Sequence, residues 1–244
     1  MNEGLQVLNG NSCPSVNLPE NNENTHPTVL TISHPFTNYQ DTLYLDFPLS
    51  GSVSGCLKRL SDVCISVFFI VAIFSWLAPI IALFVVLNSK GPVFFLQART
   101  KKKGVPFTCI KFRSMVVNPY SDRLTTVEND NRITSVGKYL RKYHLDELPQ
   151  LFNVLFGDMS IIGPRPHMIT ENQNYQRLLP NYDFRHRVKP GITGLAQSLG
   201  YHGSSYDAQK IQKRLDLDIQ YITEWSIAMD VKILFRTMRM LCHK

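Results

Sequence analysis

The chain has 244 residues, and 44% of them are hydrophobic, which is enough to form a hydrophobic core and excludes a protein that is disordered throughout. The formal net charge is +7, yet residues 1–57 hold five acidic residues and no lysine or arginine. The remaining chain holds all 26 basic residues and 14 of the 19 acidic ones, and so carries +12. A region this basic favours partners with phosphate groups, whether nucleic acid, anionic lipid or a charged small substrate.

The five cysteines stand singly, without a CxxC pair and without a histidine at metal-ligand spacing nearby. This spacing argues against a zinc site and against a disulfide framework. The sequence also lacks the HExxH, GxxxxGK(S/T) and GxSxG motifs, which argues against the common zinc proteases, P-loop proteins and hydrolases.

Residues 1–54 are rich in asparagine, proline, serine and threonine and show no sustained apolar period. They lack the basic start of a signal peptide, so we expect a disordered polar tail. An alternative stays open for the aromatic residues at positions 39–47, which would then pack against the folded part of the chain.

A membrane segment is predicted at residues 55–88. Within it, residues 63–87 form a run of 25 residues without a charge. This run is longer than the roughly 18 apolar residues that mark a membrane helix, so a buried helix of a soluble core is the weaker alternative.

Pro79 interrupts this run and predicts a bend or break near Ala78, because proline removes one backbone hydrogen bond and its ring clashes with the preceding turn. The part before the break, residues 63–78, would rise only about 24 Å, less than the roughly 30 Å of a hydrocarbon core. Basic residues flank both ends of the segment, and basic flanks prefer the cytoplasm. We therefore favour a re-entrant helical hairpin over a single-pass helix, and both alternatives leave residues 89–244 in the cytoplasm.

The cytoplasmic part is predicted to be α+β and mainly helical. Residues 92–99 and 106–115 are short, β-prone runs joined by a lysine-rich turn with a glycine, a pattern typical of a β-hairpin. Apolar residues then recur at helical spacing in four segments, at residues 135–143, 151–155, 207–225 and 230–241. The last segment is amphipathic, and it either lies on a membrane surface or packs as an ordinary helix.

The candidate catalytic residues are two adjacent acids, Asp146 and Glu147. On a helix their side chains would diverge by about 100°, so they are expected to take separate roles. A carboxylate can attack a phosphorus atom and form an acyl-phosphate, while a second carboxylate holds Mg²⁺. The structural alternative is that Asp146 caps the start of a helix whose first turn contains Glu147 and Pro149.

Arg165 is a candidate substrate-binding residue, together with its neighbour Pro164. It lies between two prolines and follows a glycine, so its backbone is restricted, and its planar guanidinium suits a phosphate group. A rigid surface turn with a solvated arginine is the alternative.

Three further basic residues are candidates for binding a phosphorylated substrate. Arg141 lies five residues before Asp146, although a solvated arginine at a helix end is the default. Lys111 and Arg113 project from the same side of an extended segment, because alternate residues of a strand face together. They either bind phosphate or extend their charged ends to lipid headgroups.

Five motifs together closely resemble the bacterial sugar transferase family, the polyprenyl-phosphate hexose-1-phosphate transferases. They are KRLSD at residues 58–62, KFRSM at 111–115, LDELPQLFNVLFGDMSIIGPRP at 145–166, RHRVKPGITGLAQ at 185–197 and LDLDIQYITEWSIAMDVKIL at 215–234. The resemblance covers residues 57–241, and the long central block is highly specific. It implies a monotopic protein of the bacterial inner (cytoplasmic) membrane, with a catalytic domain at residues 89–244 on the cytoplasmic face.

The activity that the resemblance implies is transfer of a sugar-1-phosphate from a UDP-sugar to undecaprenyl phosphate, with release of UMP. This is the first step of exopolysaccharide, capsule or O-antigen synthesis. Residues 201–234 look more like members that use UDP-glucose or UDP-galactose than like those that use acetamido sugars. The expected partners are the UDP-sugar, the polyprenyl phosphate and membrane lipid; a homodimer is left open, and no specific nucleic acid is expected.

The resemblance also assigns roles to individual residues. Asp146 becomes the nucleophile that carries a covalent phosphosugar in a ping-pong reaction, and Glu147 beside it assists in holding Mg²⁺. The phosphate-binding positions of the family fall on Arg141 and Arg165.

One departure concerns Ala78, since relatives often have serine before the helix-breaking proline. A serine hydroxyl helps to satisfy backbone groups at a break, so the sharpness of the hairpin depends on other donors here. Two rival functions are a non-catalytic membrane-surface scaffold and nucleic-acid binding, and the absence of a groove-reading module argues against the second.

Overall fold

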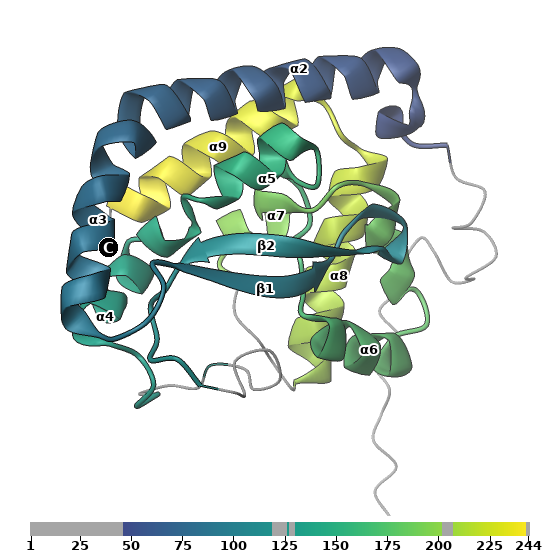
Figure 1. The fold of residues 1–244 in the computed structure, drawn as a ribbon. Helices are drawn as coiled ribbons and strands as arrows, with labels where there is room; N and C mark the ends of the chain where they lie inside the picture. Colours follow the sequence, from purple (N-terminus) through teal and green to yellow (C-terminus); the bar gives the residue numbers. More distant parts are fainter. Residues whose placement is uncertain (1–45, 119–125, 127–129, 202–206, 243–244) are drawn as a thin grey trace, which may run out of the picture. The chain divides into compact units, whose positions relative to one another are not determined.

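The computed structural model describes residues 46–118, 126, 130–201 and 207–242 (Figure 1). Within this part the protein is mainly helical, with two small two-stranded sheets. The predicted polar tail lies outside the described residues as far as residue 45. The end of that range is folded, because helix α2 begins at Ser52 and both Phe47 and Leu49 pack against the hydrophobic core.

The predicted membrane segment is a helix of 37 residues, long and apolar enough to cross a membrane. It consists of α2 (Ser52–Phe69), a π-helical turn at Ile70–Phe74 and α3 (Ser75–Asn88). In Figure 1, α3 runs in a different direction from α2. The predicted bend is therefore present, and it lies at Ile70–Phe74 instead of at Ala78. Whether the segment re-enters or spans a membrane stays a prediction.

The position of the bend follows from the chemistry of Pro79, which lies inside α3. Proline has no N–H to donate to the carbonyl four residues earlier, and its ring crowds the preceding turn. The misfit is taken up one turn before it, where Ser75 N donates to Ile70 O in the π-helical pattern. Two side chains donate hydrogen bonds to backbone carbonyls of this turn, a role that a serine at position 78 could otherwise take. Ser75 Oγ donates to Val71 O at 2.7 Å, and Trp76 Nε1 donates to Ala72 O at 2.8 Å.

The burial of this helix is reversed relative to a helix of a soluble protein. In α2 the buried residues are polar, namely Lys58, Asp62 and Ser66, whereas Leu60 and Phe68 are 61% and 64% exposed. Only 11% of the most apolar window is buried. The alternative of a buried core helix is therefore wrong, and the exposed apolar stripe suits hydrocarbon as its surroundings.

The buried polar face of α2 joins the membrane helix to the rest of the fold. Lys58 Nζ lies 3.1 Å from both Asp62 Oδ1 and Asp230 Oδ2. Asp62 Oδ1 also accepts hydrogen bonds from Ser160 Oγ at 2.9 Å and from Ile161 N at 3.0 Å. Asp62 therefore connects α2 with the β3 strand (Ser160–Ile162), and Lys58 connects α2 with the first turn of α9 (Ile227–Cys242).

We expect Asp62→Asn to lower the free energy of unfolding by about 1.5–3 kcal/mol, because the buried Lys58 loses one of its two carboxylate partners and keeps Asp230. Thermal unfolding in detergent measures this loss. Asp158→Asn is the matched control: its ion pair with Lys101 is partly exposed, and breaking it should change stability by less than about 1 kcal/mol. Equal stability of the two variants would contradict a joining role for Asp62.

The predicted β-hairpin is confirmed. Strands β1 (Phe94–Thr100) and β2 (Pro106–Phe112) pair antiparallel, with Gln97 opposite Cys109. Helix α5 (Gln150–Phe156) lies against the outer edge of β2. Asn153 of this helix replaces a neighbouring strand, since its Oδ1 accepts from Ile110 N at 3.0 Å and its Nδ2 donates to Thr108 O at 2.7 Å.

The four predicted helical segments are also confirmed, as α4 (Ser135–Lys142), α5, α8 (Ala208–Thr223) and α9. Helix α6 (Ile169–Leu178), the short α7 (Leu195–Ser198) and a second sheet, in which β3 pairs parallel with β4 (Gly191–Thr193), were not predicted. The two strands are three residues long, too short for an alternating pattern. The close approach of the two strands requires glycine at position 191, because a Cβ there would lie 2.1 Å from Gly163 N.

Candidate active site

A cavity of about 1020 Å³ contains both acids of the central motif. Its walls come from the β1–β2 hairpin, the turn that carries Asp146 and Glu147, and helices α2 and α9. Lys111, Arg113, Arg141 and Arg165 line the same cavity. The structure thus brings together the two predicted catalytic residues and four of the five predicted substrate-binding residues.

Asp146 and Glu147 lie on a short 3₁₀ turn, Leu145–Glu147, and not at the start of an α-helix. The residue before the turn, His144, has a left-handed backbone with φ of 55°, which is uncommon outside glycine and concentrates at functional sites. Helix α5 begins after Pro149 and has no side-chain cap. The alternative in which Asp146 caps a helix is therefore wrong.

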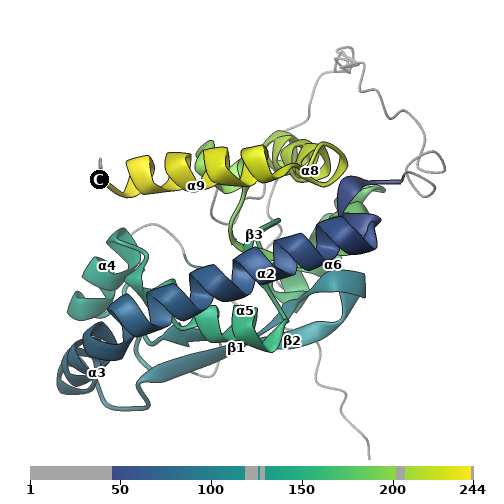
Figure 2. The same cartoon turned by 90° about the horizontal axis from the view of Figure 1, so that it is seen from above.

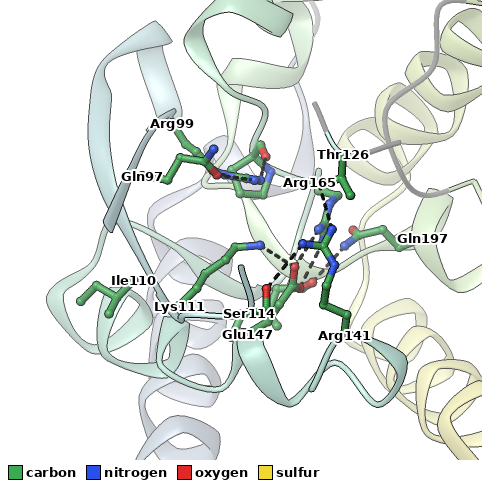
Figure 3. A network of polar contacts seen from close by, with 12 residues as sticks. Gln97, Arg99, Ile110, Lys111, Ser114, Thr126, Arg141, Glu147, Arg165 and Gln197 are labelled. Atoms are coloured by element: carbon green, nitrogen blue, oxygen red, sulfur yellow. Dashed lines mark hydrogen bonds and ion pairs between the residues drawn. The ribbon is translucent and has the colours of Figure 1, made fainter. Parts of the chain in front are cut away.

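Glu147 is held by two cations, which point toward its carboxylate in Figure 3. Lys111 Nζ lies 2.7 Å from Oε1, and Arg165 donates to both oxygens, at 2.7 Å and 3.2 Å. Burial by itself would raise the pKa of Glu147, but Arg165 and Lys111 outweigh it and hold the pKa well below its ordinary range. Glu147 is therefore charged at neutral pH and fixes the position of both cations.

Asp146 is buried like its neighbour but differs in its partners. It has no hydrogen bond or ion pair among the residues that the structure describes. Burial, together with the charge of Glu147, raises the pKa of Asp146 to about 6, although Lys111, Arg141 and Arg165 oppose the shift. A carboxylate without a partner, close to three cations, is available to react.

Arg141 is the one of these three cations whose partners are neutral. Its guanidinium donates to Thr126 Oγ1 at 3.0 Å and to Ser114 Oγ at 3.5 Å (Figure 3). Within the described part of the chain it makes no ion pair with a carboxylate. Its charge is thus free to bind an anionic group that enters the cavity.

The loop that carries Arg165 is fixed by two arginines that sequence reasoning missed. Arg185 donates to Arg165 O at 2.6 Å, and Arg99 donates to Pro166 O at 2.5 Å. Arg185 is itself buried and paired with Asp218 at 2.9 Å. Its place in the RHRVKPGITGLAQ motif was the available signal, but nothing in the spacing of residues 165 and 185 indicates this contact.

Arg113 and Pro164, also predicted to bind substrate, make contacts with the protein backbone. Arg113 donates to the carbonyls of Ser89 and Val85, at 2.7 Å and 3.3 Å, and to that of Lys90, so it caps the end of α3. Burial lowers the pKa of its guanidinium. Pro164 does not line the main cavity, and its carbonyl accepts from Gly191 N at 2.9 Å beside the β3–β4 pair.

The donor set of the cavity fits a weakly held Mg²⁺ better than a fully protein-bound metal. Among the described residues no three potential ligands of the His, Cys, Asp or Glu types come together. Magnesium needs only one or two carboxylates when phosphate oxygens and water complete its shell. Asp146 has free oxygens, whereas Glu147 would have to give up a contact with Lys111 or Arg165.

The model of the family described as bacterial sugar transferase matches residues 53–244. The chain belongs to this family. The family expectation drawn from the five motifs is thereby confirmed, and the matched range includes the membrane helix and every residue of the site.

Curated relatives are similar over the same region. The chain is 47% identical over 193 residues to the UDP-glucose:undecaprenyl-phosphate glucose-1-phosphate transferase of Klebsiella pneumoniae, covering 79% of this chain and 41% of that protein. A protein of the same name from Caulobacter vibrioides is 40% identical over 191 residues, which are 78% of this chain and 71% of the relative. The UDP-N-acetylgalactosamine-undecaprenyl-phosphate N-acetylgalactosaminephosphotransferase of Aeromonas hydrophila is 42% identical over 192 residues, 78% of this chain and 45% of the relative. The chain thus spans less than half the length of two of these relatives.

Proposed function

We propose that this sugar transferase moves a sugar-1-phosphate from a UDP-sugar to undecaprenyl phosphate and releases UMP, as the first step of exopolysaccharide, capsule or O-antigen synthesis. The observation that carries the proposal is the buried carboxylate of Asp146, which has no partner among the described residues and lies close to Lys111, Arg141 and Arg165. The names of the relatives supply the substrate classes. UDP-glucose is the first donor to test, with UDP-galactose next.

The reaction has two balanced steps in this proposal. An oxygen of Asp146 attacks the phosphorus bonded to the sugar; the bond from that phosphorus to the bridging oxygen breaks, and UMP leaves with the electron pair. An oxygen of the lipid phosphate then attacks the same phosphorus, and the bond to Asp146 breaks. The carboxylate is regenerated, and the product is a lipid-linked sugar diphosphate.

The cations of the cavity bind and orient the phosphates. Arg141 makes no ion pair with a carboxylate among the described residues, so its guanidinium can bind a phosphate of the donor. Lys111 and Arg165 are positioned beforehand by Glu147, so they lose little freedom when the diphosphate binds. Mg²⁺, held by Asp146 and phosphate oxygens with Glu147 close by, would neutralise charge on the leaving phosphate.

The apolar surfaces favour a membrane location, with residues 89–244 on the cytoplasmic face of the inner membrane. Exposed apolar side chains continue along α2 and α3 and recur on α9 at Val231, Phe235 and Met238. The i, i+4 and i+7 spacing places these three residues on one face of α9, as in helices that lie in a membrane surface. The re-entrant topology remains part of this proposal, because the bend at Ile70–Phe74 allows both ends to lie on one side.

UMP release tests the proposed function. Protein in detergent or nanodiscs is incubated with Mg²⁺, undecaprenyl phosphate and one UDP-sugar at a time, and we expect acceptor-dependent UMP from one donor. Chelation of the metal with EDTA should abolish turnover, and added Mg²⁺ should restore it. If no UDP-sugar yields UMP, the proposal fails and the membrane-scaffold alternative gains support.

The pH dependence of the first step follows from the pKa of Asp146. Since burial raises this pKa to about 6 and only the carboxylate attacks, kcat/KM for the UDP-sugar should rise with pH through about 6 and be level above it. At pH 5 it should be about a tenth of the plateau. A profile that is level between pH 5 and 8 would contradict the assignment.

A further inference from the structure

We propose that the part of the cavity between α2 and α9 binds the isoprenoid chain of the lipid phosphate acceptor. We call this part the apolar lobe. It is lined by Ile65 and Phe69 of α2, Ile192 of β4, and Leu234, Met240 and Leu241 of α9. The inference rests on the proposed function, because it assigns a site to one of the two substrates of that reaction.

The two helices divide their apolar residues between an inner and an outer face. Leu234 and Leu241 are half-buried and line the cavity, whereas Phe235, next to Leu234 in the chain, is 70% exposed. On α2, Ile65 and Phe69 line the cavity one helical turn apart, and Phe68 faces outward. Each helix thus presents hydrocarbon to the cavity as well as to its surroundings.

The helices are joined at one end and separate toward the other. The ion pair of Lys58 with Asp230 connects the first half of α2 with the first turn of α9. In both views α9 lies farther from α2 at its C-terminal end than at its start (Figures 1 and 2). The lobe residues of α2 and α9 all follow the ion pair in their helices, so the lobe lies on the side of the ion pair where the two helices are farther apart.

The chemistry of the walls identifies the occupant as a hydrocarbon chain attached to a phosphate. The hydroxyls of Thr193 and Thr237 line the cavity here, but they are 2.8 Å apart and bond to each other, and Thr237 also donates to Ile233 O. They have little to offer a polar ligand. A nucleotide sugar is polar throughout and needs partners for its hydroxyls, whereas an isoprenoid chain needs none.

The lobe and the charged site belong to one cavity, which matches the two parts of the acceptor. Asp146 and Arg141 line it together with Leu234 and Ile65. A lipid phosphate bound with its chain in the lobe therefore has its headgroup directed at the cations around Asp146. The outer faces of α2 and α9 are apolar, so the chain passes from lobe to bilayer without crossing water.

The test separates the two steps of the reaction. In Leu234→Trp, with the indole filling the lobe, we expect the burst of UMP from donor alone to stay within twofold of the wild type. Turnover with undecaprenyl phosphate should fall at least about tenfold. Ile65→Trp, on the opposite wall, should behave in the same way, and Phe235→Trp, on the outer face of α9, should retain both steps.

The outcomes distinguish this inference from the proposed function. Unchanged turnover in both Leu234→Trp and Ile65→Trp would overturn the inference, and so would loss of the donor burst in both, because the lobe would then serve the donor or the fold. Absence of a UMP burst from the wild type with every UDP-sugar would instead overturn the proposed function. In the wild type, acceptor KM should also rise as the isoprenoid chain is shortened at constant headgroup, and this rise should be smaller in Leu234→Trp.

Discussion

Replacing Asp146 by asparagine should reduce UMP release by about a thousandfold or more, both with and without undecaprenyl phosphate, because an amide cannot form the covalent phosphosugar. Single-turnover measurements with the donor alone check this directly. Asp158→Asn, which changes a carboxylate outside the cavity, is the matched control and should retain activity. Normal turnover of Asp146→Asn would remove the nucleophile from the proposal and favour the scaffold alternative.

The same substitution should leave the fold intact and make it more stable at pH 7. The pKa of Asp146 in the folded protein is about 6, above the ordinary value of 3.8, so the folded state binds its proton more tightly than the unfolded state. The free energy of unfolding therefore falls as pH rises from about 4 to 6, and above pH 6 the full cost of burying the charged carboxylate applies. Asp146→Asn should recover on the order of 1–3 kcal/mol at pH 7 and little at pH 4, as measured by thermal unfolding.

Glu147→Gln should lower UMP release by about a hundredfold, because Lys111 and Arg165 lose the carboxylate that positions them. It should also destabilise the fold by about 3–5 kcal/mol, since the buried Lys111 and the partly buried Arg165 both lose their carboxylate partner. Glu224→Gln, on the exposed end of α8, is the control for the chemical change alone. A double-mutant cycle with Lys111→Met should show a coupling between residues 111 and 147.

The pH profile of Glu147→Gln distinguishes a positioning role from a purely metal-binding one. The charge of Glu147 raises the pKa of Asp146, and Lys111 and Arg165 lower it. With a neutral side chain at position 147, the rise of the residual kcat/KM with pH should have its midpoint below pH 6. A limb that stays at 6, combined with a higher Mg²⁺ requirement, would indicate that Glu147 acts mainly as a metal ligand.

Local sequence patterns were sufficient to predict those elements whose structure depends mainly on their own residues. The uncharged run at residues 63–87 predicted the membrane helix, and the β-prone runs around a lysine-rich turn predicted the hairpin. Pro79 predicted the bend, although its place at Ile70–Phe74 depends on how the preceding turn rearranges. Contacts such as Arg185 with Arg165 O, or Asn153 with the edge of β2, join distant positions, and no periodicity in one sequence reveals them.

The roles of the basic residues show the same limit. Lys111 and Arg113 share one face of an extended segment, and both line the cavity. Their ends reach opposite partners, since Lys111 pairs with Glu147 and Arg113 caps α3. The sequence left phosphate binding and lipid contact open for both, and it did not indicate the contact of Arg113 with the end of α3.

The cap that Arg113 places on α3 has a mechanical consequence. Residues 111 and 113 are separated by about 7 Å of extended chain, at roughly 3.3 Å per residue, and one holds Glu147 while the other holds the last turn of the membrane helix. If this helix lies in a bilayer as proposed, a bilayer that is thicker or thinner than the helix requires changes its tilt or depth, and the short extended segment from Arg113 to Lys111 would transmit that displacement to the site. We therefore expect UMP release to depend on membrane thickness, with different rates in detergent micelles and in bilayers of different lipids.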